Sequence, residues 1–276
     1  MQKTILITGC SSGIGLDAAQ EMRDRGWRVF ASCRKAQDCD RLRAEGFDAP
    51  RIDYTDADSI TAGLAEVLAA TGGTLDVLFN NGAHGLPGAV EDLATDGLRN
   101  IFETNVFGWH ELTRQVLPVM RAQGHGRIVQ NSSILGFVAF PWRGAYVATK
   151  YAIEGLTDTL RVELVDTEIK VSLIEPGPVT SEFRVNAIPH FERYIDWKTS
   201  ALRPLYEKKL LKRLYESSGP DQFELPASAV TAKLIHACES PRPRPRYYVT
   251  TPTHVAGVLR RILSTRAIDR ILARLR

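Results

Sequence analysis

The stretch "TGCSSGIG" (Thr8–Gly15) decides how this chain folds, because it places three glycines between an apolar run and a helical pattern. The run "TILIT" leads into it, and "LDAAQEMRDRG" follows it. Glycine lets a backbone approach a ligand closely, and a helix N-terminus attracts phosphate. The stretch therefore predicts a phosphate-binding loop, although it matches neither the P-loop nor the Gly-x-Gly-x-x-Gly template.

Length and composition indicate a globular protein. The 276 residues, 44% hydrophobic and 24% charged, suit one large α/β domain or two small ones. No apolar run reaches the ~18 residues of a membrane span, and no signal-peptide pattern is present. The cysteines Cys10, Cys33, Cys39 and Cys238 have no metal-type spacing with the histidines. We therefore expect a cytoplasmic protein with free thiols and no metal site.

The net charge of +3 hides an asymmetry. Residues 258–276 hold six arginines and one aspartate, which is +5, so the rest of the chain carries about −2. Charge therefore gives the body of the protein no nucleic-acid role. Residues 252–276 predict a basic amphipathic extension that either docks on the domain or lies weakly on a membrane surface. Docking is favoured, because one short helix binds a bilayer weakly.

Short apolar runs alternate with helical stretches along the chain. The candidate strands are residues 3–8, 27–33, 49–55, 75–81, 126–133, 169–177 and 246–251. This alternation predicts right-handed βαβ units, and the nearly continuous apolar runs predict a buried parallel sheet. We therefore expect a single α/β domain, with a doubly wound parallel sheet of about seven strands and helices on both faces.

Residues 179–225 break this alternation. A long irregular segment in a compact domain is more often a functional lid than a plain connection. Its large aromatic residues are Phe183, Phe191, Tyr194, Trp197, Tyr206 and Tyr215. They indicate a bulky apolar substrate beneath the lid or, equally, a dimer interface or the lid's own small core. His190 is expected at the surface rather than against a substrate.

The end of the second candidate strand indicates which dinucleotide the loop binds. An NAD site places Asp or Glu there to hold the ribose 2′-hydroxyl. Here Cys33 stands at the tip, followed by Arg34 and Lys35. Arginine can hold a 2′-phosphate with two hydrogen bonds, whereas an acid would repel it. The sequence therefore predicts NADP, although the two cations alone would also suit a solvated helix start.

Three residues form a candidate proton-transfer group. In "YVATK", Tyr146 and Lys150 are spaced i and i+4, on one helix face. A cation beside a tyrosine favours the phenolate and lowers its pKa from about 10. Ser133 ends the 126–133 strand, at the edge where open α/β sheets hold ligands. Its hydroxyl can donate to an oxygen on which negative charge develops.

With these motifs in order, the chain resembles the short-chain dehydrogenase/reductase family over about residues 3–183. "TGCSSGIG" matches the family's TGxxxGxG loop, "YVATK" matches its YxxxK motif, and Ser133 matches its catalytic serine by spacing. The combination of "TGCSSGIG" and "ASCRK" is most similar to the 17β-hydroxysteroid and retinol dehydrogenase branch and to related bacterial reductases. The resemblance implies a Rossmann-type fold and an NAD(P)-dependent enzyme.

The resemblance also implies further site residues. Asn105 matches the asparagine that holds a relay water toward the lysine, and Asp53 matches an adenine contact. "NNGA" stands where the family has Asn-Asn-Ala-Gly, so close packing beside the cofactor should survive. The expected catalytic residues are Ser133, Tyr146, Lys150 and Asn105. The expected cofactor-binding residues are Gly9, Cys10, Ser11, Ser12, Gly13, Ile14, Gly15, Cys33, Arg34, Asp53, Asn80, Gly82, Tyr146, Lys150, Pro176, Gly177 and Val179.

The resemblance implies reversible hydride transfer between NADP and a carbonyl or alcohol. The aromatic residues at 179–225 favour a bulky apolar substrate, such as a steroid, a retinoid or a long-chain aldehyde. The resemblance also implies a homodimer or homotetramer through two long helices. Two other functions stay open. A non-catalytic NADP-binding sensor would be expected to have lost Ser133, Tyr146 or Lys150. An epimerase or dehydratase of the family's extended branch would need a larger C-terminal substrate domain.

Overall fold

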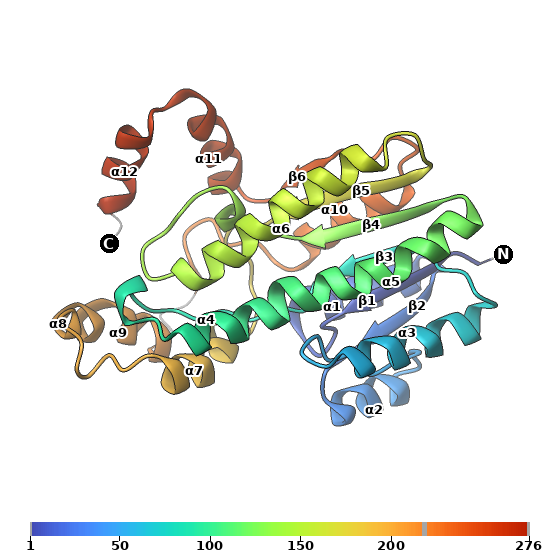
Figure 1. The fold of residues 1–276 in the computed structure, drawn as a ribbon, viewed down its shortest axis with the longest axis horizontal. Helices are drawn as coiled ribbons and strands as arrows, with labels where there is room; N and C mark the ends of the chain where they lie inside the picture. Colours follow the sequence, from blue (N-terminus) through green and yellow to red (C-terminus); the bar gives the residue numbers. More distant parts are fainter. Residues whose placement is uncertain (1, 217–219, 275–276) are drawn as a thin grey trace.

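The computed structural model describes residues 2–216 and 220–274 (Figure 1). Residues 217–219 of the expected lid and 275–276 of the expected extension lie outside the described residues. The strands are β1 (Thr4–Thr8), β2 (Arg28–Ser32), β3 (Val77–Asn80), β4 (Gly126–Asn131), β5 (Ile169–Glu175) and β6 (Arg246–Tyr248).

The α-helices follow the strands as the sequence predicts. They are α1 (Gly13–Asp24), α2 (Ala36–Ala44), α3 (Ala57–Thr71), α4 (Thr95–Phe102), α5 (Gly108–Gln123), α6 (Gly144–Glu163), α7 (Phe183–Tyr194), α8 (Arg203–Leu205), α9 (Leu211–Tyr215), α10 (Ser228–Glu239), α11 (Thr251–Ile262) and α12 (Thr265–Ala273). Four shorter turns are η1 (Val90–Asp92), η2 (Glu103–Phe107), η3 (Ile134–Gly136) and η4 (Tyr206–Leu210).

The sheet is parallel throughout, with the order β2-β1-β3-β4-β5-β6. The α/β class is therefore confirmed, but the described residues contain six strands rather than about seven. The expected strand at 49–55 meets β2 only at two isolated bridges, Phe30 to Asp48 and Cys33 to Arg51. Pro50 lies between these bridges and has no N–H to donate, so a continuous ladder does not form.

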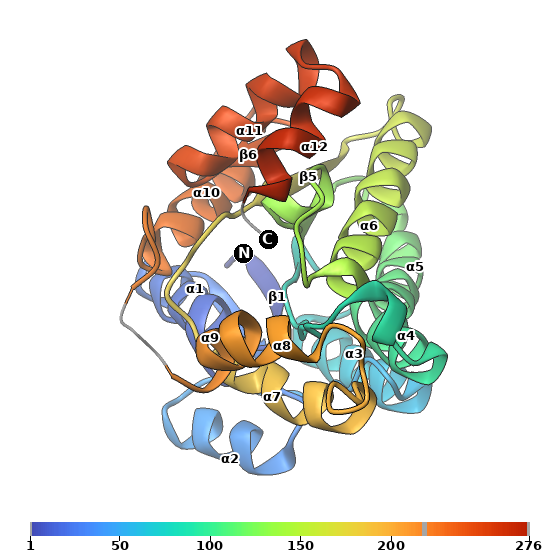
Figure 2. The ribbon, with the colours of Figure 1, turned by 90° about the vertical axis from the view of Figure 1, so that its left-hand side faces the viewer.

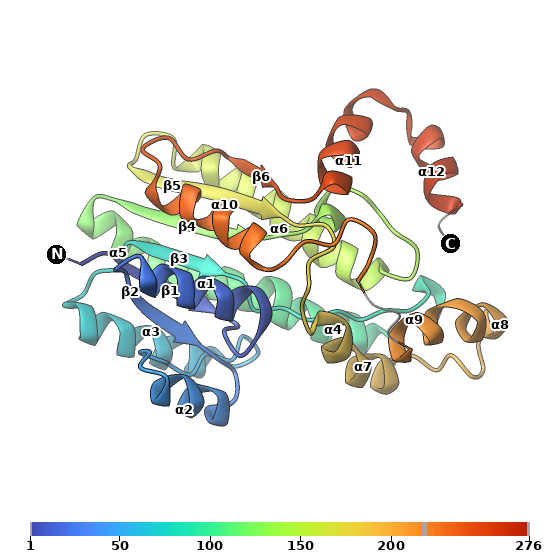
Figure 3. The ribbon, with the colours of Figure 1, turned by 180° about the vertical axis from the view of Figure 1, so that it is seen from behind.

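Helices cover both faces of the sheet, and alternate residues of the strands face opposite cores. Ile5 and Ile7 of β1 pack under α1 and α10, in front in Figure 3. Leu6 faces the second core, which α3, α5 and α6 close on the side seen in Figure 1. This buried sheet holds its carboxyl ends fixed, and the site lies at that edge.

Residues 179–225, called here the lid segment, carry α7, α8 and α9 beyond the carboxyl ends of the strands (Figure 2). Phe191 and Tyr206 are fully buried in a third apolar cluster, and the Tyr206 hydroxyl donates to Asp92 at 2.8 Å. These two aromatic rings therefore pack the lid segment against Leu86, Ile101 and Ala145 of the domain. Phe183 and Tyr215 instead line the neighbouring cavity.

The C-terminal helices α11 and α12 extend away from the sheet (Figures 1 and 3). One face of α11 docks, because Thr253 and Gly257 are buried and Gly257 packs against Tyr248. The opposite face exposes Val258 and Ile262, which are 59% and 69% exposed. The expected docking thus accounts for only one face of α11. Among the described residues, no helix combines the length and apolarity that crossing a membrane requires.

Candidate active site

A cavity of about 880 Å³ opens at the carboxyl ends of the strands and is lined in part by the lid segment. Residues that directly follow four strands line it: Gly9 after β1, Asn81 after β3, Ser132 after β4 and Pro176 after β5. Ligands of open α/β sheets bind at this edge. The predicted residues that line it are Gly9, Ser11, Ser12, Gly13, Ile14, Gly82, Ser133, Tyr146, Lys150, Pro176, Gly177 and Val179.

The glycine loop has the geometry of a phosphate site. Gly9 and Gly13 have φ angles of 70° and 56°, in the left-handed region that favours glycine. A Cβ at Gly9 would lie 2.6 Å from the Cα of Gly82, so no larger residue fits there. Ser12 makes no side-chain cap to α1, whose first N–H groups therefore have no competing side-chain acceptor from that residue. These features fit the diphosphate of a dinucleotide.

Ser133, Tyr146 and Lys150 meet on one wall of this cavity. Lys150 Nζ lies 5.4 Å from the centre of the Tyr146 ring and donates to the main-chain oxygen of Asn131 at 2.7 Å. Ser133 hydrogen bonds to Tyr146, and this bond lowers the tyrosine pKa. Helix α6 thus presents a phenol and an ammonium beside the hydroxyl at the end of β4.

Burial dominates the electrostatics of this group. It raises the pKa of Tyr146 above its ordinary value despite the bond from Ser133. It also lowers the pKa of Lys150 to about 7, with Glu154 opposing the change. Lys150 is not among the causes that set the pKa of Tyr146, so the expected lowering of that pKa by the lysine stays a prediction. Burial disfavours the charged form of both groups.

Asn105 lies outside the cavity lining, in the π-helical turn η2 between α4 and α5. Its side chain accepts from the His84 backbone N–H at 3.1 Å and donates to the His84 carbonyl at 2.9 Å. Asn80 also points inward, where it accepts from the Tyr54 hydroxyl at 2.6 Å. Asn81, the next residue, lines the cavity in its place.

Five other expected cofactor residues do not line the cavity. Gly15 packs against the Gly9 carbonyl, and Cys10 lies in the core with its thiol 3.2 Å from the Ile7 carbonyl. The others are Cys33, Arg34 and Asp53. Their cofactor contacts stay predictions.

Arg41 adds a cation near the expected 2′-phosphate site. It lies on α2, and its Nη2 donates to the Ser11 carbonyl of the glycine loop at 2.7 Å. Arg34 is exposed at the end of β2, and burial raises the pKa of the neighbouring Cys33 to about 12. A neutral thiol and two arginines therefore surround this end of the strand. Nothing in the helical pattern of residues 36–44 distinguishes Arg41 as a loop contact.

Trp109 supports the lysine in a way that the sequence analysis missed. Its indole Nε1 donates to the Gly82 carbonyl at 2.7 Å, and Lys150 Nζ lies 4.3 Å from its ring. A cation over an indole face is an attractive contact. The residue thus ties the glycine of the "NNGA" stretch to the candidate catalytic lysine.

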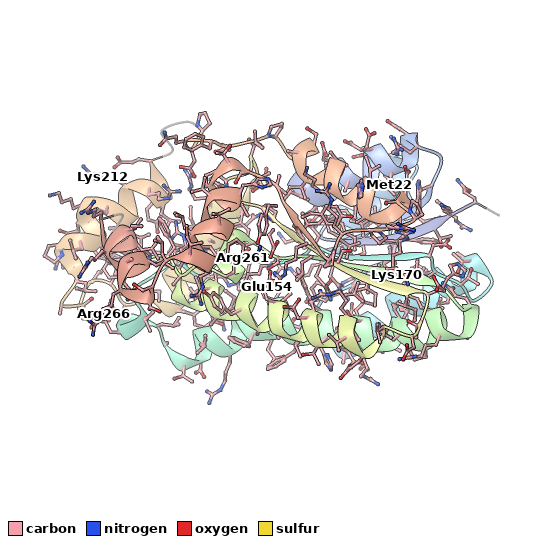
Figure 4. The ribbon with its side chains drawn as sticks, turned by 90° about the horizontal axis from the view of Figure 1, so that it is seen from above. Met22, Glu154, Lys170, Lys212, Arg261 and Arg266 are labelled. Carbon is pink, nitrogen blue, oxygen red and sulfur yellow. The ribbon has the colours of Figure 1, made fainter. Side chains whose placement is uncertain are left out.

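A buried acidic pair lies one helical turn beyond Lys150. Glu154 of α6 and Glu175 at the end of β5 both bind Arg246 of β6, and the Glu175 contact is 2.5 Å. Burial, together with the charge of Glu154, raises the pKa of Glu175. The arginine therefore connects the helix that carries Tyr146 to the strand that leads into Pro176. Figure 4 labels Glu154 beside the sheet.

His190 is not the free surface residue that the sequence analysis expects. Its ring stacks on His84 with 3.6 Å between centroids and 8° between planes. Burial is the main cause that lowers the pKa of His84, to about 4, and of His190. The stack joins α7 of the lid segment to the loop after β3. Among the described residues, no group of three or more His, Cys, Asp or Glu side chains could hold a metal.

Comparison with known proteins agrees with this geometry. A family model described as "short chain dehydrogenase" matches residues 3–190. The chain is 40% identical over 272 residues to the uncharacterized oxidoreductase YbbO of Escherichia coli, covering 99% of this chain and 94% of that protein. It is 36% identical over 191 residues to human retinol dehydrogenase 8, covering 66% of this chain and 60% of that protein.

A solved structure shares the fold over nearly the whole chain. It is a short-chain dehydrogenase/reductase from Burkholderia phymatum in complex with NAD. The TM-score is 0.77 at 25% identity, and the match covers 99% of this chain and 95% of that one. The similarity therefore includes the lid segment and the C-terminal helices as well as the sheet.

Proposed function

The chain belongs to the short-chain dehydrogenase family, and on this premise we propose that it transfers hydride between NADP and the carbonyl or alcohol group of a bulky apolar substrate. It is an oxidoreductase, as its relatives are. One observation carries the proposal: Ser133, Tyr146 and Lys150 line the same cavity as the glycine loop. The non-catalytic alternative is not favoured, because all three candidate catalytic residues are present and gathered.

Each of these residues has a distinct role in carbonyl reduction. The nicotinamide supplies the hydride when it is bound. Ser133 donates a hydrogen bond to the substrate oxygen, on which negative charge develops. Tyr146, whose raised pKa keeps it protonated at neutral pH, gives that oxygen its proton. Lys150 supports the ring of Tyr146, and the Asn131 carbonyl and Trp109 hold the lysine.

The charges around the end of β2 support NADP rather than NAD. Arg34 and Arg41 supply positive charge, and Cys33 stands where an NAD site would have a carboxylate. The 2′-phosphate carries negative charge that arginine binds well. The glycine loop and α1 would hold the diphosphate.

The lid segment supports an apolar substrate. Phe183 and Leu214 line the cavity from this segment, and Leu86 and Phe140 face it from the domain. The Phe183 ring packs edge-on against Tyr146 at 5.1 Å between centroids. An apolar group bound between them would lie beside the proton donor. The relative retinol dehydrogenase 8 is named for an alcohol with a large apolar body.

Two surfaces support partners beyond the substrate. Helix α6 exposes Tyr151 and Val162 on one face, as a helix that packs against a second copy would, and also exposes Leu156. We therefore include a homodimer or homotetramer in the proposal.

The stripe of Val258 and Ile262 on α11 supports a peripheral contact with a membrane surface, strengthened by the arginines of the C-terminal helices.

A steady-state assay tests the proposed function. Purified protein would be mixed with NADPH and a panel of apolar aldehydes and ketones, and loss of absorbance of the reduced cofactor would be followed. We expect turnover with long-chain or polycyclic carbonyls and weaker turnover with NADH. Tight NADPH binding without turnover of any carbonyl or alcohol would support the non-catalytic alternative instead.

A further inference from the structure

Arg143 occupies an unusual position beside the proposed proton donor. It directly precedes α6, three residues before Tyr146, and lines the cavity. The preceding residue, Trp142, has a φ of 65°, which is an outlier for a bulky side chain. The Gly88 N–H donates to the Trp142 carbonyl at 3.0 Å, and the Trp142 ring packs on Tyr206 at 4.9 Å. Two contacts therefore hold the strained turn that sets the direction of Arg143.

The guanidinium of Arg143 has no carboxylate partner among the described residues. Its hydrogen bond is to the Trp142 carbonyl, at 3.3 Å. The arginines Arg184 and Arg213 also line the cavity and share the carboxylate of Asp221 at 3.2 and 2.8 Å. Burial and these two cations lower the pKa of Arg143 to about 10, with Asp221 opposing them.

One further acid at this end of the cavity, Glu224, is already engaged. Glu224 accepts a hydrogen bond from Thr180 at 2.7 Å and from the backbone N–H of Asp221 at 2.7 Å. A half-buried cation without an anion is costly for a folded protein. Such a cation persists where a ligand supplies the missing charge. The apolar side chains of Phe140 and Leu86 line the same cavity.

We propose that Arg143 binds a carboxylate of the substrate, so that the substrate is an apolar carbonyl compound with an acid group at some distance from its carbonyl. This inference rests on the proposed function and narrows its substrate class. Arginine pairs with a planar carboxylate through two parallel hydrogen bonds, which fix orientation as well as affinity. The apolar body would lie between Phe183 and Leu214, with its carbonyl at Tyr146.

The cofactor's phosphates are the other source of such an anion, and a binding measurement separates the two. NADPH affinity would be titrated by fluorescence in the wild-type protein and in Arg143→Met. We expect the same dissociation constant in both, because the glycine loop and Arg34 hold the cofactor. A large loss of NADPH affinity in a folded Arg143→Met protein would assign the arginine to the cofactor and overturn the proposal.

The substrate test compares oxo acids with their methyl esters. Short, medium and long ω-oxo acids would be reduced with NADPH, each beside its ester, which differs only in charge at the far end. We expect a lower KM for the acid at one or more lengths. In Arg143→Met the KM of that acid should rise about tenfold or more, the usual scale for losing a charge-assisted pair, while the ester's KM stays nearly unchanged. Arg143→Lys should restore part of the preference.

Two outcomes oppose the proposal in different ways. Equal KM values for acid and ester at every length, with good turnover of both, would contradict the carboxylate site and still support the oxidoreductase function. No turnover of any acid or ester would point instead to failure of the proposed function. Arg99→Met, at an exposed pair with Asp96, is the control for loss of an arginine. If Arg143→Met does not fold, Arg143→Lys carries the test, with a weaker acid preference expected and an unchanged one contradicting the proposal.

Discussion

Lys150 Nζ donates a 2.7 Å hydrogen bond to the main-chain oxygen of Asn131, so the candidate catalytic helix is fastened to the last residue of β4. The lysine is 1% exposed, and its ammonium also faces the rings of Trp109 and Tyr146. Through this one side chain, strand β4, helix α5 and helix α6 meet at the cavity. The chemistry and the stability of the site are therefore coupled at Lys150.

Replacing Tyr146 with phenylalanine should abolish turnover without disturbing the cofactor site. The variant removes the hydroxyl proton and keeps the ring that packs on Phe183. We expect kcat to fall at least ~100-fold, the usual scale for loss of a general acid. Fluorescence titration of NADPH should give a nearly unchanged dissociation constant. Retained turnover would contradict the assignment of Tyr146 as proton donor.

Lys150→Met should stabilise the cofactor-free protein most at low pH. Burial lowers the folded-state pKa of Lys150 to about 7, below its ordinary value of 10.5. Between pH 7 and 10.5 the unfolded chain binds more protons than the folded protein, so the free energy of unfolding of the wild type rises with pH. Below about pH 7 the lysine is charged in both states, and the full cost of burying that charge destabilises the folded protein. Thermal melts across pH should show the largest gain in Tm for the variant below about pH 7, shrinking as pH rises toward 10.

The same variant should lose turnover at every pH, because the ring of Tyr146 loses its neighbouring ammonium. A gain in Tm that is independent of pH would assign the effect to apolar packing alone. A loss of Tm at all pH values would show that the bond to Asn131 outweighs the burial of the charge.

The sequence could predict the loop and the catalytic group because local spacing determines them. Glycines at 9 and 13 are needed for left-handed φ, and i to i+4 spacing places Tyr146 and Lys150 on one face. It could not predict the pKa values, because burial depends on which elements close over α6. The end of β3 could not be placed to within one residue from the sequence either. Asn80 was therefore predicted as a cofactor residue where Asn81 lines the cavity, because successive side chains of a strand point to opposite faces.

Contacts between distant segments were also beyond the sequence. Arg246 meets Glu154 across 92 positions, and the aromatic residues of the lid segment divide between the third apolar cluster, shared with the domain, and the cavity. The sequence left that division open because both roles use the same residue types. Pro50 could have signalled the missing edge strand, since proline has no N–H for a ladder.

Arg246→Met should destabilise the protein most strongly above about pH 8, where the Glu175 carboxyl would otherwise be ionised. The variant leaves Glu154 and Glu175 buried without their common cation. Removing one partner of a buried pair costs about 3–5 kcal/mol. The folded-state pKa of Glu175 is already raised and should rise further, so the loss should shrink as pH falls and the carboxyl is protonated.

Urea unfolding at about pH 9.5 and about pH 6 would measure this change, because the wild-type pKa of Glu175 is about 8. Arg99→Met, which breaks an exposed pair with Asp96, is the matched control and should change little. An equal destabilisation at both pH values would show that Arg246 acts by packing rather than by neutralising the acids.

Arg34→Met should weaken the binding of NADPH but not that of NADH. The side chain is exposed at the end of β2, near Arg41, and the proposed contact is the 2′-phosphate that NADH lacks. We expect the KM for NADPH to rise about tenfold and that for NADH to stay nearly constant, because a charge-assisted bond to phosphate is lost. Parallel rises for both cofactors would instead indicate damage to the glycine loop.

Introducing negative charge into the apolar stripe on α11 should abolish contact with anionic membranes. Val258 and Ile262 project from the face opposite Gly257, and Arg261 and Arg266 lie on the two C-terminal helices (Figure 4). We expect the wild-type protein to float with vesicles of phosphatidylglycerol, to float less with phosphatidylcholine, and to dissociate as salt rises.

The double variant Val258→Asp with Ile262→Asp should stay in the soluble fraction and keep its NADPH affinity, because these side chains lie outside the cavity lining. Val165→Asp is the control, since Val165 is a similarly exposed apolar residue outside the C-terminal helices. Flotation of the double variant equal to wild type would contradict a membrane role for this stripe. A concentration-dependent dimer that the same variant disrupts, with no flotation of wild type, would assign the stripe to a second copy of the chain.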